Sequence, residues 1–114
     1  MILRSMLFIP ADSEKKLSKA DGVEADALIF DLEDSVATPR KQIGREMINE
    51  FMSARAQTDR KTKFYVRINP LESDAPLRDL AGIMAGKPDG IMVPKVSGPH
   101  DVDLISKYLD VLEI

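Results

Sequence analysis

Charged and amide side chains follow several of the short apolar runs in this sequence. The acidic cluster 31–34 (Asp-Leu-Glu-Asp) comes directly after the apolar run 27–30, and Arg67 and Asn69 close a later run. Carboxylates can border the water shell of a hard cation such as Mg²⁺, or hold an arginine in position. A guanidinium beside buried apolar residues needs a partner, because an unpaired buried charge is costly. Its planar fork suits a substrate carboxylate, or an oxygen that gains negative charge during a reaction.

Each of these groups also has a purely structural interpretation. The acidic cluster could be a solvated turn before a helix, where the helix dipole favours acids. Arg67 could form an internal ion pair with Glu33 or Asp34, and the two roles can hold together. Lys95 follows another apolar run, where an ion pair or a solvent-directed ammonium is favoured over a Schiff base. Arg4 could meet a phosphate, the acidic turn or solvent.

The elements that must position these groups alternate between strands and helices. Apolar runs predict strands at residues 3–9, 27–30, 63–68 and 90–94. Helical spacing and capping residues, with Asp12 or Ser13 as the first N-cap, predict helices at 13–21, 39–55, 76–85 and 99–109. This order is typical of a parallel sheet covered by helices on both faces. Ligands of such sheets bind beyond the carboxyl ends of the strands, which is where the charged groups fall.

Composition limits the class of protein. The chain has 114 residues and a formal net charge of −3, which excludes a strongly basic nucleic-acid binder. It has no cysteine and a single histidine, His100, which excludes thiol nucleophiles, zinc ribbons and histidine clusters within the chain. No apolar run is long enough for a membrane span, and the N-terminus becomes charged too early for a secretory signal. We therefore expect a cytoplasmic protein with no nucleic-acid or membrane partner.

The chain is too short to form a complete (βα)₈ barrel by itself. A closed (βα)₈ barrel takes about 250 residues, so four βα units form either a small open sheet or half of a barrel. The apolar stretch at 111–114, which looks like a strand just beginning, favours the half barrel. We therefore expect the α/β class, as a partial TIM (βα)₈ barrel with residues 1–114 as its N-terminal half. Unpaired strand edges and an uncovered apolar face would make such a half associate as a homo-oligomer.

Four segments, in their order and spacing, resemble the motifs of one family. They are Arg4-Ser-Met-Leu-Phe-Ile-Pro10, Asp31-Leu-Glu-Asp-Ser-Val36, Val66-Arg-Ile-Asn-Pro70 and Gly90-Ile-Met-Val-Pro-Lys-Val96. Together they are similar to the citrate lyase β-subunit group of the HpcH/HpaI aldolase superfamily, whose relatives include malyl-CoA and citramalyl-CoA lyases. The resemblance covers essentially the whole chain, but only about the N-terminal half of the family domain.

The resemblance implies a (βα)₈ barrel with Mg²⁺-dependent carbon–carbon lyase activity. The substrate would be a 3-hydroxyacyl thioester of the citryl-, malyl- or citramalyl-CoA type, on CoA or an acyl-carrier protein, and the products a ketoacid and an acyl thioester. In this family the arginine that matches Arg67 binds substrate, and the acids that match Glu33 and Asp34 border the metal and its waters. Arg4 is then a candidate for contacts to CoA or phosphate, and Lys95 for a substrate contact.

The chain departs from the family pattern in ways that bear on activity. Ala11 stands where the family usually has Gly, and Ser13 replaces an Arg-Pro pair, which affects the expected contacts to the thioester carrier. The family's direct metal ligands follow its fifth and sixth strands, beyond Ile114, and Glu113 does not lie in the family's Glu-Thr motif. The resemblance therefore implies no metal ligand in this chain, and we expect the 114 residues alone to be inactive. The alternatives are a short non-catalytic α/β binding module, or a thioester hydrolase or pyruvate aldolase of the same superfamily.

Overall fold

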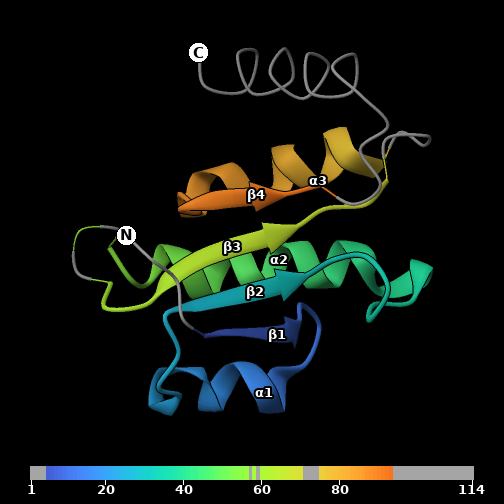
Figure 1. Cartoon of the computed structure of the whole chain (residues 1–114). Helices are drawn as coiled ribbons and strands as arrows, with labels where there is room; N and C mark the ends of the chain where they lie inside the picture. The colour runs from blue at the N-terminus through green and yellow to red at the C-terminus, as the bar shows by residue number, and fades with distance from the viewer. Residues whose placement is uncertain (1–4, 57, 59, 71–74, 94–114) are drawn as a thin grey trace.

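The computed structural model describes residues 5–56, 58, 60–70 and 75–93 (Figure 1). Within them, a parallel sheet has the strand order β1-β2-β3-β4. The strands are β1 (Met6–Pro10), β2 (Ala27–Asp31), β3 (Lys63–Arg67) and β4 (Gly90–Met92). The helices are α1 (Glu14–Lys19), α2 (Lys41–Ser53) and α3 (Ala75–Ile83), with short 3₁₀ turns η1 (Ala20–Gly22), η2 (Thr38–Arg40) and η4 (Met84–Gly86). No helix of this part of the chain is long and apolar enough to cross a membrane.

The strands and helices predicted within the described residues are present, with small shifts at their ends. Ser13 is the N-cap of α1, because its hydroxyl accepts a hydrogen bond from the backbone N–H of Lys16. The predicted helix 39–55 divides into the 3₁₀ turn η2 and the α-helix α2, and the third strand ends one residue earlier than predicted. The helix predicted at 99–109 and the apolar stretch 111–114 lie outside the described residues.

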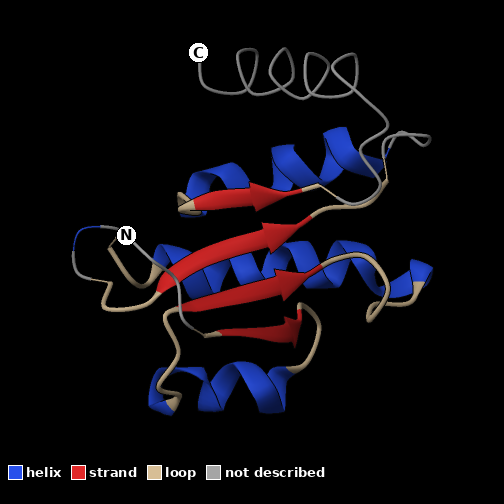
Figure 2. Cartoon of the chain, viewed as in Figure 1, coloured by secondary structure: helices blue, strands red, loops and turns tan. Residues whose placement is uncertain are grey.

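The helices cover one face of the sheet, so the prediction of helices on both faces is wrong for the described residues. Leu28, Phe30, Phe64 and Val66 point to this face and are buried with side chains from α1, α2 and α3 in one core. The rings of Phe30, Phe51 and Phe64 form its centre, with centroids 5.4–5.7 Å apart. Figure 1 shows α2 passing behind β2 and β3, and Figure 2 shows the same arrangement by element type. A partial barrel accounts for this layout, since barrel helices lie only outside the strands.

The opposite face of the sheet carries the residues that alternate with the core. Phe8, Ile29 and Tyr65 lie side by side on it through the parallel register. Met6 is 54% exposed and Phe8 46% exposed, so an apolar surface of β1 remains open. Because successive side chains of a strand point to opposite faces, Asp31 and Arg67 lie on this open face, at the carboxyl ends of β2 and β3.

A pair of phenylalanines on neighbouring strands tests the assignment of the two faces. Phe30→Ala removes a fully buried ring and should lower the free energy of unfolding by about 3–5 kcal/mol. Phe8→Ala removes a half-exposed ring and should cost less than about 1 kcal/mol. Urea unfolding followed by circular dichroism measures both. Equal losses for the two variants would contradict the assignment. Phe30→Leu, which removes less volume and should still cost more than Phe8→Ala, covers the case in which Phe30→Ala does not fold.

Candidate functional site

An arginine and an aspartate pair at the carboxyl ends of the two central strands. The register places Asp31 of β2 opposite Arg67 of β3. Nε of Arg67 donates to Oδ1 of Asp31 at 2.8 Å, and Nη2 donates to Oδ2 at 2.7 Å. The Asp31 side chain is 2% exposed and that of Arg67 22% exposed. Two parallel charge-assisted bonds therefore fix the plane of the guanidinium at the edge of the open face.

The acidic turn, residues 32–36, follows β2 and folds around the Asp31 carboxylate. The backbone N–H of Glu33 donates to Oδ1 at 2.8 Å, and the backbone N–H of Ser35 donates to Oδ2 at 3.1 Å. The hydroxyl of Ser35 donates to Oδ2 as well. An aspartate at the start of a turn bonds the following backbone in this way, so the Asp-x-Glu-x-Ser spacing itself favours the turn.

These contacts keep both members of the pair charged. Burial alone would raise the pKa of Asp31, but the hydrogen bonds from Arg67, from the Ser35 hydroxyl and from the Glu33 and Ser35 amides hold it well below its ordinary value. The hydrogen bonds that Arg67 donates to Asp31 raise the pKa of Arg67 against the opposing effect of burial, and the charges of Asp31, Glu33 and Asp34 add to the increase. The site is therefore a fixed ion pair across the ordinary pH range.

Part of the Arg67 guanidinium stays available. Its Nε lies 3.5 Å from Oε1 of Glu33, and its Cζ lies 4.9 Å from the centre of the Phe8 ring. Among the described residues, Nη1 makes no hydrogen bond. Arg67 lines an open cavity of about 460 Å³ together with Phe8, Pro10, Lys16, Asp31, Asp34 and Ser35. A carboxylate or an oxyanion of a small ligand could accept the remaining N–H groups there.

The structure brings three of the predicted site residues together. Arg67, Glu33 and Asp34 all lie at the same end of the sheet, and Asp34 is exposed at the cavity. The expected internal ion pair of Arg67 exists, but its principal partner is Asp31, with Glu33 second. The signal for Asp31 was its place at the end of its strand, since the ends of neighbouring parallel strands lie opposite each other. The two other candidates, Arg4 and Lys95, lie outside the described residues.

Asn69, which also follows a strand, turns away from the cavity. Its side-chain N–H₂ donates to Oδ2 of Asp79 at 2.6 Å, and its backbone N–H donates to the same oxygen at 2.8 Å. The guanidinium of Arg45 donates to Oδ1 of Asp79 at 2.7 Å. All three residues are buried. This buried network ties the loop after Arg67 to α2 and α3, and so has a structural role.

The described residues offer no ligand set for a metal ion. They contain no group of three or more His, Asp or Glu side chains placed to hold one. Both oxygens of Asp31 already accept hydrogen bonds, and Glu33 lies against Arg67. A divalent cation at this end of the sheet would need its direct protein ligands from elsewhere.

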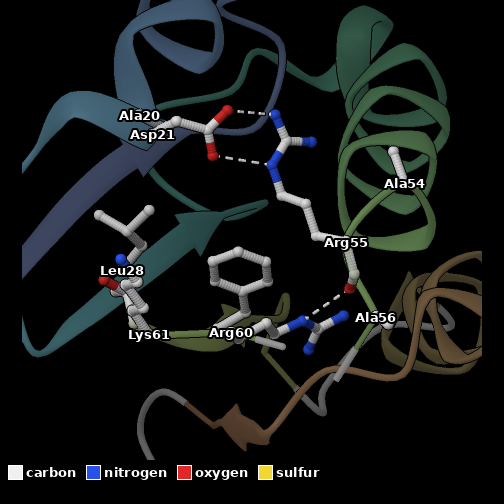
Figure 3. Close-up of a pocket in the computed structure, with 10 residues that line it drawn as sticks. Ala20, Asp21, Leu28, Ala54, Arg55, Ala56, Arg60 and Lys61 are labelled. Atoms are coloured by element: carbon white, nitrogen blue, oxygen red, sulfur yellow. Dashed lines mark hydrogen bonds and ion pairs between the residues drawn. The ribbon is translucent and has the colours of Figure 1, made fainter. Parts of the chain in front are cut away.

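A second cavity, of about 390 Å³, lies at the amino ends of the strands and has a different character. Figure 3 shows Arg55 aimed at Asp21, where Nε donates to Oδ1 at 2.8 Å and Nη2 donates to Oδ2. Arg60 donates through all three of its nitrogens to backbone carbonyls, those of Met52, Arg55, Gly86 and Lys87. Both guanidinium groups are thus used to hold helices and loops, in contrast to Arg67.

Sequence comparison places the chain among known proteins. A family model described as HpcH/HpaI aldolase/citrate lyase matches residues 4–113. The chain is 38% identical over 106 residues to a (3S)-malyl-CoA thioesterase of Cereibacter sphaeroides, covering 93% of this chain and 36% of that protein. It is also 38% identical over 106 residues to citrate lyase subunit beta of Escherichia coli, covering 93% and 34%. The chain therefore spans about a third of the length of these curated relatives, and the predicted resemblance is confirmed.

Solved structures agree with this placement. The citrate lyase beta subunit of Mycobacterium tuberculosis, complexed with oxaloacetate and magnesium, superposes with a TM-score of 0.73 at 30% identity, covering 89% of this chain and 42% of that one. The CitE protein of the same organism, in complex with magnesium, acetoacetate and coenzyme A, gives 0.73 at 30% identity, covering 89% and 35%. The predicted fold class, an α/β partial TIM barrel, is thereby confirmed.

Replacing the Asp31 carboxylate by an amide tests its role in the site. Asp31→Asn leaves Arg67 without its principal counter-ion and should lower the free energy of unfolding at pH 7 by about 2 kcal/mol. A folded pKa below the unfolded value of about 3.9 stabilises the fold above that pH. The difference between wild type and variant should therefore shrink as the pH falls from about 5 towards 2.

Urea unfolding at several pH values measures this effect. Asp34→Asn, in the same turn but exposed, serves as the control and should change stability by less than about 0.5 kcal/mol. A wild-type advantage over Asp31→Asn that stayed constant down to pH 2 would refute the assigned ion pair.

Proposed function

The chain belongs to the HpcH/HpaI aldolase/citrate lyase family, and on this premise we propose that it forms part of a Mg²⁺-dependent carbon–carbon lyase. The proposed substrate is a 3-hydroxyacyl thioester of the citryl-, malyl- or citramalyl-CoA type, and the products are a ketoacid and an acyl thioester. Relatives named citrate lyase subunit beta and malyl-CoA/beta-methylmalyl-CoA/citramalyl-CoA lyase support this class. The observation that carries it is the guanidinium of Arg67, fixed by Asp31 and still open to a ligand.

The proposed reaction breaks the bond between the carbon that bears the hydroxyl and the α-carbon of the thioester. The hydroxyl loses its proton and becomes the carbonyl of the ketoacid, while the α-carbon keeps the electron pair as a thioester enolate and then takes up a proton. Arg67 would bind the acid portion and stabilise an oxygen that gains charge. Because Asp31 holds the guanidinium beforehand, this stabilisation needs little reorganisation during the reaction.

The remaining roles follow the family pattern. Glu33 and Asp34 would border Mg²⁺ and its waters, and the solved neighbours in complex with magnesium support that cofactor. Bound Mg²⁺ would polarise the oxygens of the ketoacid portion. Its direct ligands would lie outside the described residues, as would the substrate contacts proposed for Arg4 and Lys95. We further propose that residues 1–114 are the N-terminal half of the barrel domain, that the carrier is CoA or an acyl-carrier protein, and that the location is cytoplasmic.

Thioester hydrolysis is the second candidate function. The relatives named (3S)-malyl-CoA thioesterase are 36–38% identical to this chain, and those named citrate lyase subunit beta are 33–38% identical. Hydrolysis would release the intact hydroxyacid and free CoA, with the carbon–carbon bond unbroken. The same anchored arginine could serve it, because negative charge also develops on an oxygen when water attacks a thioester.

Product analysis separates the two functions. The complete gene product that carries this sequence, given Mg²⁺ and malyl-, citramalyl- or citryl-CoA, should release a ketoacid together with an acyl thioester. Arg67→Lys keeps the charge but loses the planar guanidinium that donates two parallel hydrogen bonds, and should lower kcat/KM by about 100-fold. Arg55→Lys, at the other end of the sheet, should leave it unchanged. The 114 residues alone should show no turnover, because the family resemblance implies that the direct metal ligands follow later strands, beyond Ile114.

Detection of free CoA together with an intact hydroxyacid would show that the protein is a thioester hydrolase and not a lyase. An unchanged rate in Arg67→Lys would remove Arg67 from either mechanism. Turnover by the purified 114-residue chain would disprove its proposed inactivity.

We also propose that the chain associates with itself. Met6, Leu7 and Phe8 of β1 are all exposed, and within the described residues β1 pairs with a strand on one side only. An apolar edge strand is prone to pair with another chain. Sedimentation at micromolar concentration should show a dimer or a larger species, and Leu7→Lys should shift it towards the monomer. Ile43→Lys, on an exposed site of α2, should not; a wild-type chain that sediments as a stable monomer would contradict the proposal.

A further inference from the structure

Lys41, the first residue of α2, lies against the backbone of the acidic turn (residues 32–36). Its ammonium donates to the carbonyl of Leu32 at 2.7 Å, to that of Glu33 at 3.0 Å and to that of Val36 at 3.1 Å. An ammonium has three N–H donors, so these three carbonyls account for all of them. None of the described carboxylates lies within ion-pair distance of it. Lys41 therefore acts on the backbone of the turn rather than on a charged side chain.

Two opposite charges organise the acidic turn. The amides of Glu33 and Ser35 point to the Asp31 carboxylate, whereas carbonyls of the same turn point to the Lys41 ammonium. The backbone N–H of Leu32 donates in addition to the carbonyl of Arg67 at 2.9 Å. With the backbone held on both sides, Glu33 lies against Arg67 and Asp34 lines the cavity.

Packing contacts fix the start of α2, where Lys41 lies. A Cβ atom at Gly44, one turn further along the helix, would lie 3.1 Å from Cβ of Ala11 and 3.3 Å from Cδ2 of Leu32. The helix thus packs closely against the loop after β1 and against the acidic turn. The preceding residue, Arg40, donates to the carboxylate of Asp12 in the loop after β1. The position of the Lys41 backbone is therefore set by contacts to the loop after β1 and to the acidic turn, whose Asp34 and Ser35 line the cavity.

We propose that Lys41 is a positioning residue of the site. Its ammonium holds the acidic turn in the conformation that keeps Glu33 beside Arg67 and Asp34 at the cavity. The part of this inference that concerns ligand binding rests on the proposed function. Without the ammonium, three carbonyl oxygens lose their donor, and the turn must open to water or rearrange.

Amide hydrogen exchange of the 114-residue chain tests the effect on the turn. In Lys41→Met, the amides of Glu33 and Ser35 should exchange about tenfold faster than in wild type, because the turn opens more readily. The amide of Val66, in β3, should change much less. Lys41→Arg keeps a cationic donor and should restore exchange to within about threefold of wild type. Lys61 is an exposed lysine at the other end of the sheet. Lys61→Met is the matched control and should leave the exchange rates of all three amides unchanged.

A spectroscopic readout separates positioning from mere stability. The Nε–H signal of Arg67 in ¹⁵N spectra should shift in Lys41→Met and return in Lys41→Arg, since Glu33 approaches this nitrogen. Oxaloacetate with Mg²⁺, titrated into the complete gene product that carries this sequence, is expected to move the same signal, and to move it less in the Lys41→Met variant of that protein. Equal acceleration of all three amides, or an unmoved Arg67 signal in Lys41→Met, would overturn the inference. Failure of wild type to respond to oxaloacetate would count against the proposed ligand class alone, because exchange and the Arg67 signal need no ligand.

Discussion

The ion pair of Asp31 and Arg67 is the interaction on which the site depends. Burying a carboxylate at the end of β2 costs desolvation, and five hydrogen bonds, from Arg67, Glu33 and Ser35, offset that cost. The same bonds set the direction of the guanidinium and the path of the acidic turn. Removing the carboxylate would therefore affect the strand ends, the turn and the open donors of Arg67 together.

The two ends of the sheet use their arginines in different ways. At the amino ends, Arg55 is bound to Asp21 and Arg60 to backbone carbonyls, so their donors hold elements together. At the carboxyl ends, Arg67 is bound on one side only and lines a cavity with its other side. In parallel barrels, groups that hold the fold lie at the amino ends of the strands and ligands bind at the carboxyl ends, and the two sets of arginines match this arrangement.

An anchored guanidinium suits a lyase and a thioester hydrolase equally, since both reactions place negative charge on an oxygen. The two proposed reactions differ in the bond that breaks. The acidic turn borders the cavity beside Arg67, and Lys41 and Asp31 hold its backbone from opposite sides.

The sequence by itself determined the order of strands and helices and the gathering of Arg67, Glu33 and Asp34 at one end of the sheet. These features rest on local periodicity, on capping chemistry and on the rule that parallel strands end together. The sequence left Asp12 and Ser13 as alternative caps of the first helix, and the structure selected Ser13. The family motifs supported the partial barrel that the βα order and the length had already favoured. Only the tertiary structure decided that Asp31 is the principal partner of Arg67, that Asn69 turns to Asp79, and that Lys41 holds the acidic turn. It also decided that the described helices share one face of the sheet. These depend on strand register and on contacts between residues far apart in the chain, which local patterns do not encode.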